Sequence, residues 1–316
     1  MSELPKSLKV VSLPEKYQGD RFSTASELVA ETSYKIIEPD SQSTWGYVSI
    51  DNTQRGPGLG GIRMVQNLSS NEIMRLARVM TLKNSAACLP YGGAKAGIIL
   101  KSSELIESSA YREELFEKLA DCLFELPSYA PAPDMGTNEK DIQLIHNNHS
   151  HKLGAEKHSR GGAGRPHENE GVPIDDWELT AHGLFSAAKV LASIDEKLNL
   201  SGTKFVVQGF GNVGAPTAIK LQELGAILVG ASDINVALWN PNGLDPIALN
   251  KIRKEYGGLT NYPLKVTKSF SSDKLDWLLE APCDILIPSA RPDAITARNA
   301  DRIQCRYILQ GANTPS

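Results

Sequence analysis

The sequence has little cysteine and no long apolar run, and each absence removes a class of protein. Its 4 cysteines among 316 residues are widely spaced, without a CxxC pair. This pattern argues against a disulfide framework and is typical of reduced thiols inside the cell. No apolar stretch approaches the roughly 20 residues of a membrane-spanning helix, and the N-terminus lacks the apolar segment of a secretory signal. We therefore expect a cytoplasmic protein without a membrane partner.

An excess of basic charge is also missing. Lysine and arginine number 33 against 37 aspartates and glutamates, which gives a net charge of −4. Without a basic block, the chain is not expected to bind nucleic acid. At roughly 100–200 residues per domain, the length predicts two domains, which we place at residues 1–170 and 171–316.

The first of these domains mixes strand and helix patterns. Strand-like runs occur at residues 46–50, 61–65 and 96–100, and residues 112–126 have the periodicity of an amphipathic helix. Ser69 and Glu72 have the spacing of a capping box, so another helix is expected to begin there. We expect an α/β domain, followed by a loop over residues 147–173, which are rich in histidine, glycine and asparagine.

The second domain begins with an expected helix and continues with a strand, a glycine-rich turn, a helix and a strand. Asp175 and Glu178 have capping-box spacing ahead of an apolar stripe, and apolar runs at residues 204–208 and 227–230 flank the glycine-rich turn. Strands that alternate with helices in this way indicate a parallel, Rossmann-like sheet.

The glycine-rich turn matches the dinucleotide-binding pattern G-x-G-x-x-G. Gly209 would permit a tight turn, Gly211 would let a pyrophosphate approach the backbone, and Gly214 would let the helix pack closely on the strand. The helix N-terminus offers free N–H groups to the phosphates. Asp233, at the end of the next strand, can accept hydrogen bonds from the ribose and would repel a 2′-phosphate. We therefore expect NAD as the cofactor, with NADP as the alternative.

Two lysines and one aspartate in the first domain are candidates for acid–base chemistry. Lys83 follows Met80 by three residues, near the apolar face of its helix. Lys95 follows a Gly-Gly-Ala turn, and Asp134 lies on a proline-stiffened loop. A lysine buried beside another cation has a lowered pKa and can serve acid–base chemistry near neutrality. Each of these charges, taken singly, is more often a solvated surface residue.

Taken together, the motifs of this chain resemble those of the glutamate/leucine/phenylalanine/valine dehydrogenases. The segments that carry the resemblance extend over nearly the whole chain from about residue 46: Gly56–Arg63, Met80–Asn84, Leu89–Lys95, Pro131–Thr137, Gly209–Gly214, Asn240–Asp245, Leu286–Ala290 and Gly311–Asn313. The resemblance implies an NAD(P)-dependent enzyme, expected to be a homo-oligomer, that oxidatively deaminates an L-amino acid to a 2-oxo acid and ammonia.

The resemblance also implies a role for each site residue. Lys83 would pair with the substrate α-carboxylate, Lys95 would activate the attacking water, and Asp134 would carry protons to and from the amino group. Further substrate-binding residues are expected at Leu59, Gly60 and Gly61. Cofactor-binding residues are expected at Thr180, Gly209, Phe210, Gly211, Asn212, Val213, Gly214, Asp233, Ile234, Ala290 and Asn313.

Leu59 decides the expected substrate. The glutamate enzymes usually have a lysine at this position to hold the side-chain carboxylate, whereas the enzymes for apolar amino acids have an apolar residue. An unpaired, desolvated carboxylate would cost several kcal/mol, so we expect a leucine-, valine- or phenylalanine-like substrate. The stretch Asn240–Asp245 looks more like the glutamate enzymes, and glutamate remains the alternative.

The C-terminal end departs from the family pattern. Family members continue for roughly another domain's worth of strand and helices beyond Ser316, so the nucleotide-binding domain is expected to be incomplete. A non-catalytic paralogue that binds NAD or a protein partner is therefore a second possibility. The histidines His146, His149, His151 and His158 have no carboxylate or cysteine at ligand spacing, and no metal site is expected.

Overall fold

The computed structural model describes residues 4–13, 30–101, 108–154, 163–164, 171–262 and 268–315, and for residues 268–275 the backbone alone. The chain forms two compact units, Met1–Pro173 and Ile174–Ser316. The sequence predicts the boundary between residues 170 and 171, three residues before its position in the structure. Each unit contains a six-stranded sheet with helices on it, and the expectation of a two-domain α/β protein is confirmed.

The sheet of the first unit has the strand order β1-β2-β3-β5-β4-β6. Its strands are β1 (Lys9–Ser12), β2 (Thr32–Ile37), β3 (Thr44–Asn52), β4 (Gly58–Val65), β5 (Gly92–Ile99) and β6 (Tyr129–Pro133). Strand β4 runs parallel to both of its neighbours, β5 and β6. The pairs β1/β2, β2/β3 and β3/β5 are antiparallel. The helices are α1 (Ser70–Ala86), α2 (Ser109–Phe124) and α3 (Glu139–Leu153).

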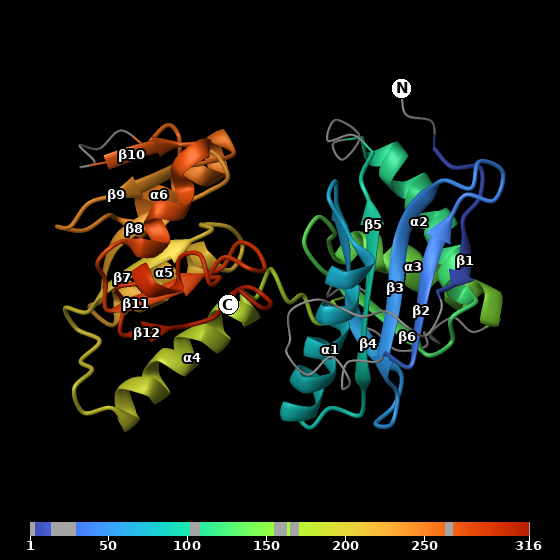
Figure 1. Ribbon diagram of the computed structural model, residues 1–316, viewed down its shortest axis with the longest axis horizontal. Coiled ribbons are helices and arrows are strands. Elements are labelled where there is room, and N and C mark those ends of the chain that lie inside the picture. Colours follow the sequence, from blue (N-terminus) through green and yellow to red (C-terminus); the bar gives the residue numbers. More distant parts are fainter. Residues whose placement is uncertain are drawn as a thin grey trace. The chain divides into compact units, whose positions relative to one another are not determined.

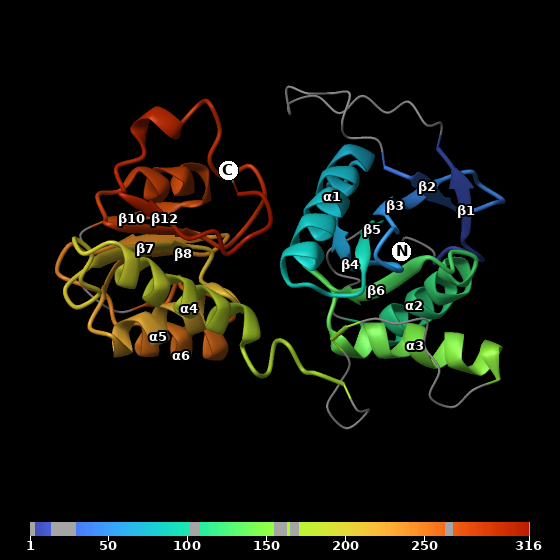
Figure 2. The same cartoon turned by 90° about the horizontal axis from the view of Figure 1, so that it is seen from below.

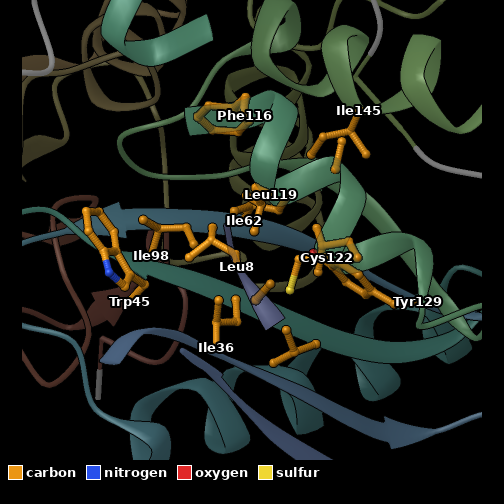
Figure 3. Close-up of a cluster of buried hydrophobic side chains, with 14 of the residues drawn as sticks. Leu8, Ile36, Trp45, Ile62, Ile98, Phe116, Leu119, Cys122, Tyr129 and Ile145 are labelled. Atoms are coloured by element: carbon orange, nitrogen blue, oxygen red, sulfur yellow. The ribbon is translucent and has the colours of Figure 1, made fainter. Parts of the chain in front are cut away.

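The helices of the first unit cover both faces of its sheet. Helices α2 and α3 lie on one face and α1 on the other (Figure 2). The side chains between the sheet and α2 and α3 form the main apolar core (Figure 3). Strand β4 contributes Ile62 and Met64 to this core, and β5 contributes Ala94, Ala96 and Ile98. Because side chains alternate along a strand, the odd-numbered residues of β4 and β5 face α1.

The second unit has the strand order β10-β9-β8-β7-β11-β12. The neighbouring strands β8, β7, β11 and β12 are parallel to one another, whereas β9 is antiparallel to both β8 and β10. Its strands are β7 (Lys204–Gln208), β8 (Ile227–Ser232), β9 (Val236–Trp239), β10 (Lys268–Ser271), β11 (Ile285–Pro288) and β12 (Tyr307–Ile308). Helices α4 (Leu179–Ile194), α5 (Gly214–Glu223) and α6 (Pro246–Tyr256) lie on one face, as Figures 1 and 2 show. The 3₁₀ helices are η3 (Ser272–Glu280) and η4 (Ala300–Arg302).

Three local predictions need correction. Lys95 lies within β5 and not on a loop, because the strand already begins at Gly92. Helix α3 continues to Leu153, through the first part of the predicted loop. Helix α4 begins at Leu179, since the expected capping box does not form: Glu178 takes the left-handed conformation, with φ of 52°, and its side chain makes no capping hydrogen bond. The described part of the chain holds no helix that is long and apolar enough to span a membrane.

The cysteines Cys283 and Cys305 form a thiol pair ahead of two neighbouring strands. Ile285 of β11 and Tyr307 of β12 lie opposite each other in the parallel sheet, and each cysteine precedes one of them by two residues. A hydrogen bond from Cys283 lowers the pKa of Cys305 to about 7, whereas the same contact, with burial, raises the pKa of Cys283. Burial raises the pKa of Cys122 to about 12. Since the thiolate is the nucleophile, Cys305 should be the more reactive thiol.

We expect iodoacetamide at pH 7 to alkylate Cys305 at least about tenfold faster than Cys122. The Cys283→Ala substitution removes the hydrogen-bond donor, so the pKa of Cys305 should rise and its alkylation should slow by roughly tenfold. Peptide mass spectrometry over a time course measures both rates. If Cys305 reacts equally fast with and without Cys283, the thiol pair does not activate it.

Candidate active site and cofactor site

Lys95 is a buried cation in the middle of β5. Its side chain is only 1% exposed. Strand β5 lies close to α1 because Gly93 has no side chain: a Cβ there would lie 2.1 Å from the backbone nitrogen of Thr81. Asn84 of α1 also holds the strands, since its amide donates to the carbonyls of Gly92 at 2.6 Å and Leu59 at 3.3 Å. The ammonium group of Lys95 therefore projects from a rigid strand.

Asp134 follows the end of β6 and pairs with this lysine. The Lys95 Nζ and Asp134 Oδ1 atoms are 3.0 Å apart. The loop is held from both sides, because the Thr137 hydroxyl donates to the Ile62 carbonyl and accepts from the Asp134 N–H. Gly61 makes room for the loop, since a Cβ there would lie 2.7 Å from the Asp134 Cβ. The predicted catalytic residues Lys95 and Asp134 are thus in direct contact.

Arg63 is a site residue for which the sequence suggested no role. Its side chain, 4% exposed, lies on β4, with Nε 2.8 Å from Asp134 Oδ2 and Nη1 2.5 Å from Glu72 Oε1. The expected cap of α1 forms, with Ser69 accepting from the Glu72 N–H, but the Glu72 carboxylate turns to Arg63. The charge of Arg63 within an otherwise apolar strand-like run, residues 61–65, is the sequence feature that could have indicated a functional role. Arg63 fixes one oxygen of Asp134 and leaves the other to Lys95.

The charges of this network shift one another's pKa. Burial, with the charges of Arg63 and Lys83, lowers the pKa of Lys95, although Asp134 opposes the shift. Burial alone would raise the pKa of Asp134, but the cations Lys95 and Arg63 hold it below its usual value. Burial would likewise lower the pKa of Arg63, and its two carboxylate partners raise it instead. The result is an ionised aspartate beside a lysine that loses its proton more easily than a free one.

The predicted substrate-binding residues differ in their surroundings. Lys83 is exposed in the last turn of α1, and Met80 and Asn84 take the buried positions instead. Its charge still acts on Lys95. Leu59 is half-buried on β4, on the same strand face as Gly61 and Arg63. Gly60 points the other way, where a Cβ would lie 1.6 Å from the Ala94 carbonyl oxygen.

The glycine-rich turn of the second unit has the geometry that a pyrophosphate needs. Gly209 has φ of +89°, and its Cβ would lie 2.7 Å from that of Ala290. A Cβ on Gly214 would lie 2.2 Å from the Gly209 carbonyl oxygen, while one on Gly211 would meet nothing within 4 Å. The backbone N–H groups of residues 211–214 have no carbonyl acceptor in the described part of the chain. These N–H groups and the open space at Gly211 fit a bound phosphate.

Two buried polar atoms mark the same edge of the sheet. Gln208 Oε1 and Ser289 Oγ, at the carboxyl ends of β7 and β11, have no hydrogen-bond partner among the described residues. Buried polar groups are nearly always satisfied, and ligands of open α/β sheets bind beyond the carboxyl ends of the strands. The predicted cofactor residues Ala290 and Asn313 lie here too, since Ala312, next to Asn313, donates to the Pro288 carbonyl.

Three predicted cofactor residues have other surroundings than expected. The Phe210 side chain is buried in the core, and its N–H donates to the Ser232 carbonyl, so neither group is available to a ligand. Asp233 already accepts three backbone hydrogen bonds. Ile234 is 82% exposed beside it. Thr180, in the first turn of α4, and Asn212 and Val213, in the glycine-rich turn, are accessible.

Comparison with known proteins assigns both units of the chain to one family. Residues 27–151 match the Glu/Leu/Phe/Val dehydrogenase dimerisation domain, and residues 171–316 match the Glutamate/Leucine/Phenylalanine/Valine dehydrogenase domain. Over 298 residues the chain is 34% identical to the glutamate dehydrogenase of Aeropyrum pernix, an alignment that covers 92% of this chain and 68% of that protein. The chain belongs to the Glu/Leu/Phe/Val dehydrogenase family.

The chain is also similar to other members of this amino-acid dehydrogenase family. The NADP-specific glutamate dehydrogenase of Saccharolobus shibatae is 32% identical over 276 residues, covering 85% of this chain and 62% of that protein. The hetero-hexameric glutamate dehydrogenase of Thermus thermophilus, in its leucine-bound form, superposes with a TM-score of 0.74 at 26% identity. That superposition covers 98% of this chain and 68% of the other. The chain thus spans about two thirds of the length of these relatives.

Three histidines of this chain, His146, His149 and His151, lie on α3. His149 is buried, with its ring nitrogen 2.9 Å from the Ala120 carbonyl oxygen and its ring edge against Phe124. His146 is also buried, His151 lies in the last turn of the helix, and His158 lies outside the described residues. Within the ranges that the structure describes, no three histidine, cysteine or acidic side chains come together as metal ligands.

Proposed function

We propose that this chain catalyses the NAD(P)-dependent oxidative deamination of an L-amino acid to a 2-oxo acid and ammonia. The observation that carries the proposal is the buried ion pair of Lys95 and Asp134, with Nζ and Oδ1 3.0 Å apart and Arg63 fixing the second aspartate oxygen. Such an arrangement positions one proton donor on strand β5 and one acceptor on the loop that Thr137 holds after β6. The match to a dimerisation domain supports assembly of the chain into a homo-oligomer.

Each charged side chain of the site has one task in this reaction. Lys83, exposed and close enough to influence Lys95, holds the α-carboxylate of the substrate. Lys95, with its lowered pKa, takes the proton of the water that attacks the substrate carbon. Asp134, kept ionised by two cations, exchanges protons with the amino group. A dinucleotide held at the glycine-rich turn, residues 209–214, would supply the nicotinamide as hydride acceptor.

Glutamate is the substrate that the comparisons favour. The relatives from Aeropyrum pernix, Saccharolobus shibatae and Thermus thermophilus are all named glutamate dehydrogenases, which supports glutamate more than the apolar amino acid expected from Leu59. Leu59 supplies no cation for a side-chain carboxylate, and it is the single observation that favours leucine, valine or phenylalanine instead. The chemistry at Lys95 and Asp134 is the same for both substrates.

A panel assay tests the proposal. Purified protein is mixed with NAD or NADP and, separately, with glutamate, leucine, valine, phenylalanine and tryptophan, and absorbance at the nicotinamide band is followed. Reduction with any of these amino acids supports the proposed reaction, and the preferred one identifies the substrate. Cofactor binding in calorimetry without reduction by any amino acid would contradict it and favour a non-catalytic paralogue.

The Leu59→Lys substitution tests the substrate pocket. We expect it to raise kcat/KM for glutamate relative to leucine by at least about tenfold, because the new ammonium would pair with the otherwise unpaired side-chain carboxylate. Parallel assays of both amino acids measure this ratio. Leu59→Met, which keeps the residue apolar, serves as the control and should leave the ratio unchanged. An unaltered ratio in Leu59→Lys would show that this position does not contact the substrate side chain.

A further inference from the structure

Arg253 of α6 reaches the glycine-rich turn from a separate helix. Its Nη1 atom lies 3.5 Å from Oδ1 of Asn212, the exposed residue between Gly211 and Val213. Its Nε and Nη2 atoms each lie 3.2 Å from Oδ1 of Asn250, one turn earlier on α6. Asn250 therefore holds the guanidinium in place, and the remaining N–H groups of Arg253 are left for another acceptor.

The charge of this guanidinium is not balanced by an acid. In the described residues, no aspartate or glutamate lies within 4.0 Å of Arg253, and burial without an anionic partner lowers its pKa. Other arginines of the chain do pair, such as Arg63 with two carboxylates and Arg302 with Glu280. A partly buried arginine without an anion, beside a phosphate-binding turn, is suited to an anionic ligand.

Asp233, the residue expected to select NAD, is occupied by the protein itself. Its Oδ1 atom accepts from the N–H groups of Asn235 and Val236 at 2.7 and 2.8 Å. Its Oδ2 atom accepts from the N–H of Leu259 at 2.6 Å, and a Cβ on Gly258 would lie 2.9 Å from the same oxygen. A carboxylate has about four acceptor positions. Three are used here, so Asp233 mainly ties the end of β8 to the segment after α6.

We propose that Arg253 selects NADP over NAD by binding the 2′-phosphate of the adenosine ribose. This inference rests on the proposed function and adds the identity of its cofactor. In dinucleotide-binding domains, the 2′ position of the ribose lies by the end of the strand after the glycine-rich turn, where an acid favours NAD and an arginine accommodates the phosphate. The guanidinium donates to two phosphate oxygens, the Asn212 amide adds a donor, and Asp233 stays with its backbone partners.

Binding titrations test this inference without catalysis. The full 316-residue chain is titrated with NADPH and with NADH, and the enhancement of nicotinamide fluorescence gives each Kd. We expect NADPH to bind at least about tenfold tighter, since a charge-assisted hydrogen bond to phosphate contributes about one to two decades of affinity. Arg253→Gln should weaken NADPH binding by about tenfold or more and leave NADH binding unchanged. Arg253→Lys, which keeps the charge, should retain part of the preference.

Lys251→Gln is the matched control, because Lys251 is an exposed cation on the same helix and the substitution removes the same charge. It should leave both Kd values unchanged. Competition by 2′,5′-ADP and 5′-AMP should show the same preference and the same dependence on Arg253.

Equal affinities for the two cofactors in the unaltered chain would overturn the inference while leaving the dehydrogenase function intact. An equal loss of NADPH and NADH binding in Arg253→Gln would overturn it as well, because it would assign Arg253 to the structure of the turn. A loss of NADPH binding in Lys251→Gln that matches that of Arg253→Gln would also overturn the inference. It would show that the positive charge of α6 as a whole, and not a contact of Arg253, accounts for the effect. Binding of neither cofactor would overturn both this inference and the proposed function.

Discussion

Replacing Lys95 with methionine is expected to lower kcat about a thousandfold while the Kd for the cofactor stays the same. General acid–base groups contribute about 10²- to 10⁴-fold to a rate, and methionine removes the amine but nearly keeps the volume of a side chain that is 1% exposed. Steady-state kinetics with the preferred amino acid and fluorescence titration with the cofactor measure the two quantities. Normal turnover would remove Lys95 from the mechanism.

Two further variants separate proton transfer from charge and from folding. Lys95→Arg keeps a cation beside Asp134 but cannot lose its proton near neutral pH, so it should be nearly as inactive as Lys95→Met. Recovery of activity in Lys95→Arg would assign Lys95 a purely electrostatic task. Lys140→Met removes an exposed lysine of the same unit and should have normal kinetics. Circular dichroism of each variant excludes unfolding as the cause of lost activity.

The Arg63→Met substitution is expected to lower the free energy of unfolding by about 3–5 kcal/mol. Loss of one partner from a buried ion pair leaves the other charge without compensation, and Arg63 has two such partners, Asp134 and Glu72. Urea denaturation measures the effect. Arg302→Met is the contrast, since Arg302 makes an equally short contact with Glu280 but its side chain is 53% exposed. Its removal should change stability much less, because water screens the pair.

The stability lost in Arg63→Met should depend on pH in a defined direction. The folded-state pKa of Asp134 lies below its ordinary value because of Lys95 and Arg63. The stabilisation by this ionised carboxylate is therefore complete above its unfolded pKa of about 3.9 and is lost as the pH falls through the lower, folded value. The difference between the unaltered chain and Arg63→Met should be largest near neutrality and shrink in acid. A difference that is constant with pH would mean that packing, and not charge, accounts for it.

The same variant should move the pH dependence of turnover. The charge of Arg63 helps to lower the pKa of Lys95, so removal of that charge should raise this pKa. The rise of kcat/KM that accompanies deprotonation of Lys95 should then occur at higher pH in Arg63→Met than in the unaltered chain. A variant that loses activity equally at every pH would indicate that Arg63 acts only on the structure.

Local sequence patterns predicted the elements that depend on neighbouring residues. The cap at Ser69 needs a partner only three residues away, and its hydrogen bond to the Glu72 N–H is present. The glycine-rich turn is similar, since a Cβ on Gly214 would meet the carbonyl oxygen of the nearby Gly209. Strand-like runs at residues 61–65 and 204–208 likewise indicated β4 and β7. Each of these features follows from spacing along a short segment.

The features that the sequence did not predict depend on distant contacts. The sequence predicts a turn just before Lys95 because Gly92 and Gly93 are typical turn residues. In the structure they belong to β5 and allow it to lie against Asn52 and Thr81. Arg63 and Asp134 are 71 residues apart, and no local pattern joins them. Asp233 Oδ2 accepts from the N–H of Leu259, 26 residues further on, and no local pattern indicates this contact. Such contacts appear only when the sheets are assembled.

The position of Leu59 on β4 bears on how this family could change substrates. Leu59 and Arg63 lie on one face of the same strand, and at 3.3 Å per residue they are about 13 Å apart. Selection for a different amino-acid substrate could therefore change residue 59, while the proposed proton-transfer residues at the other end of β4 are retained. One short strand would then let specificity diverge among descendants that inherit an unchanged reaction.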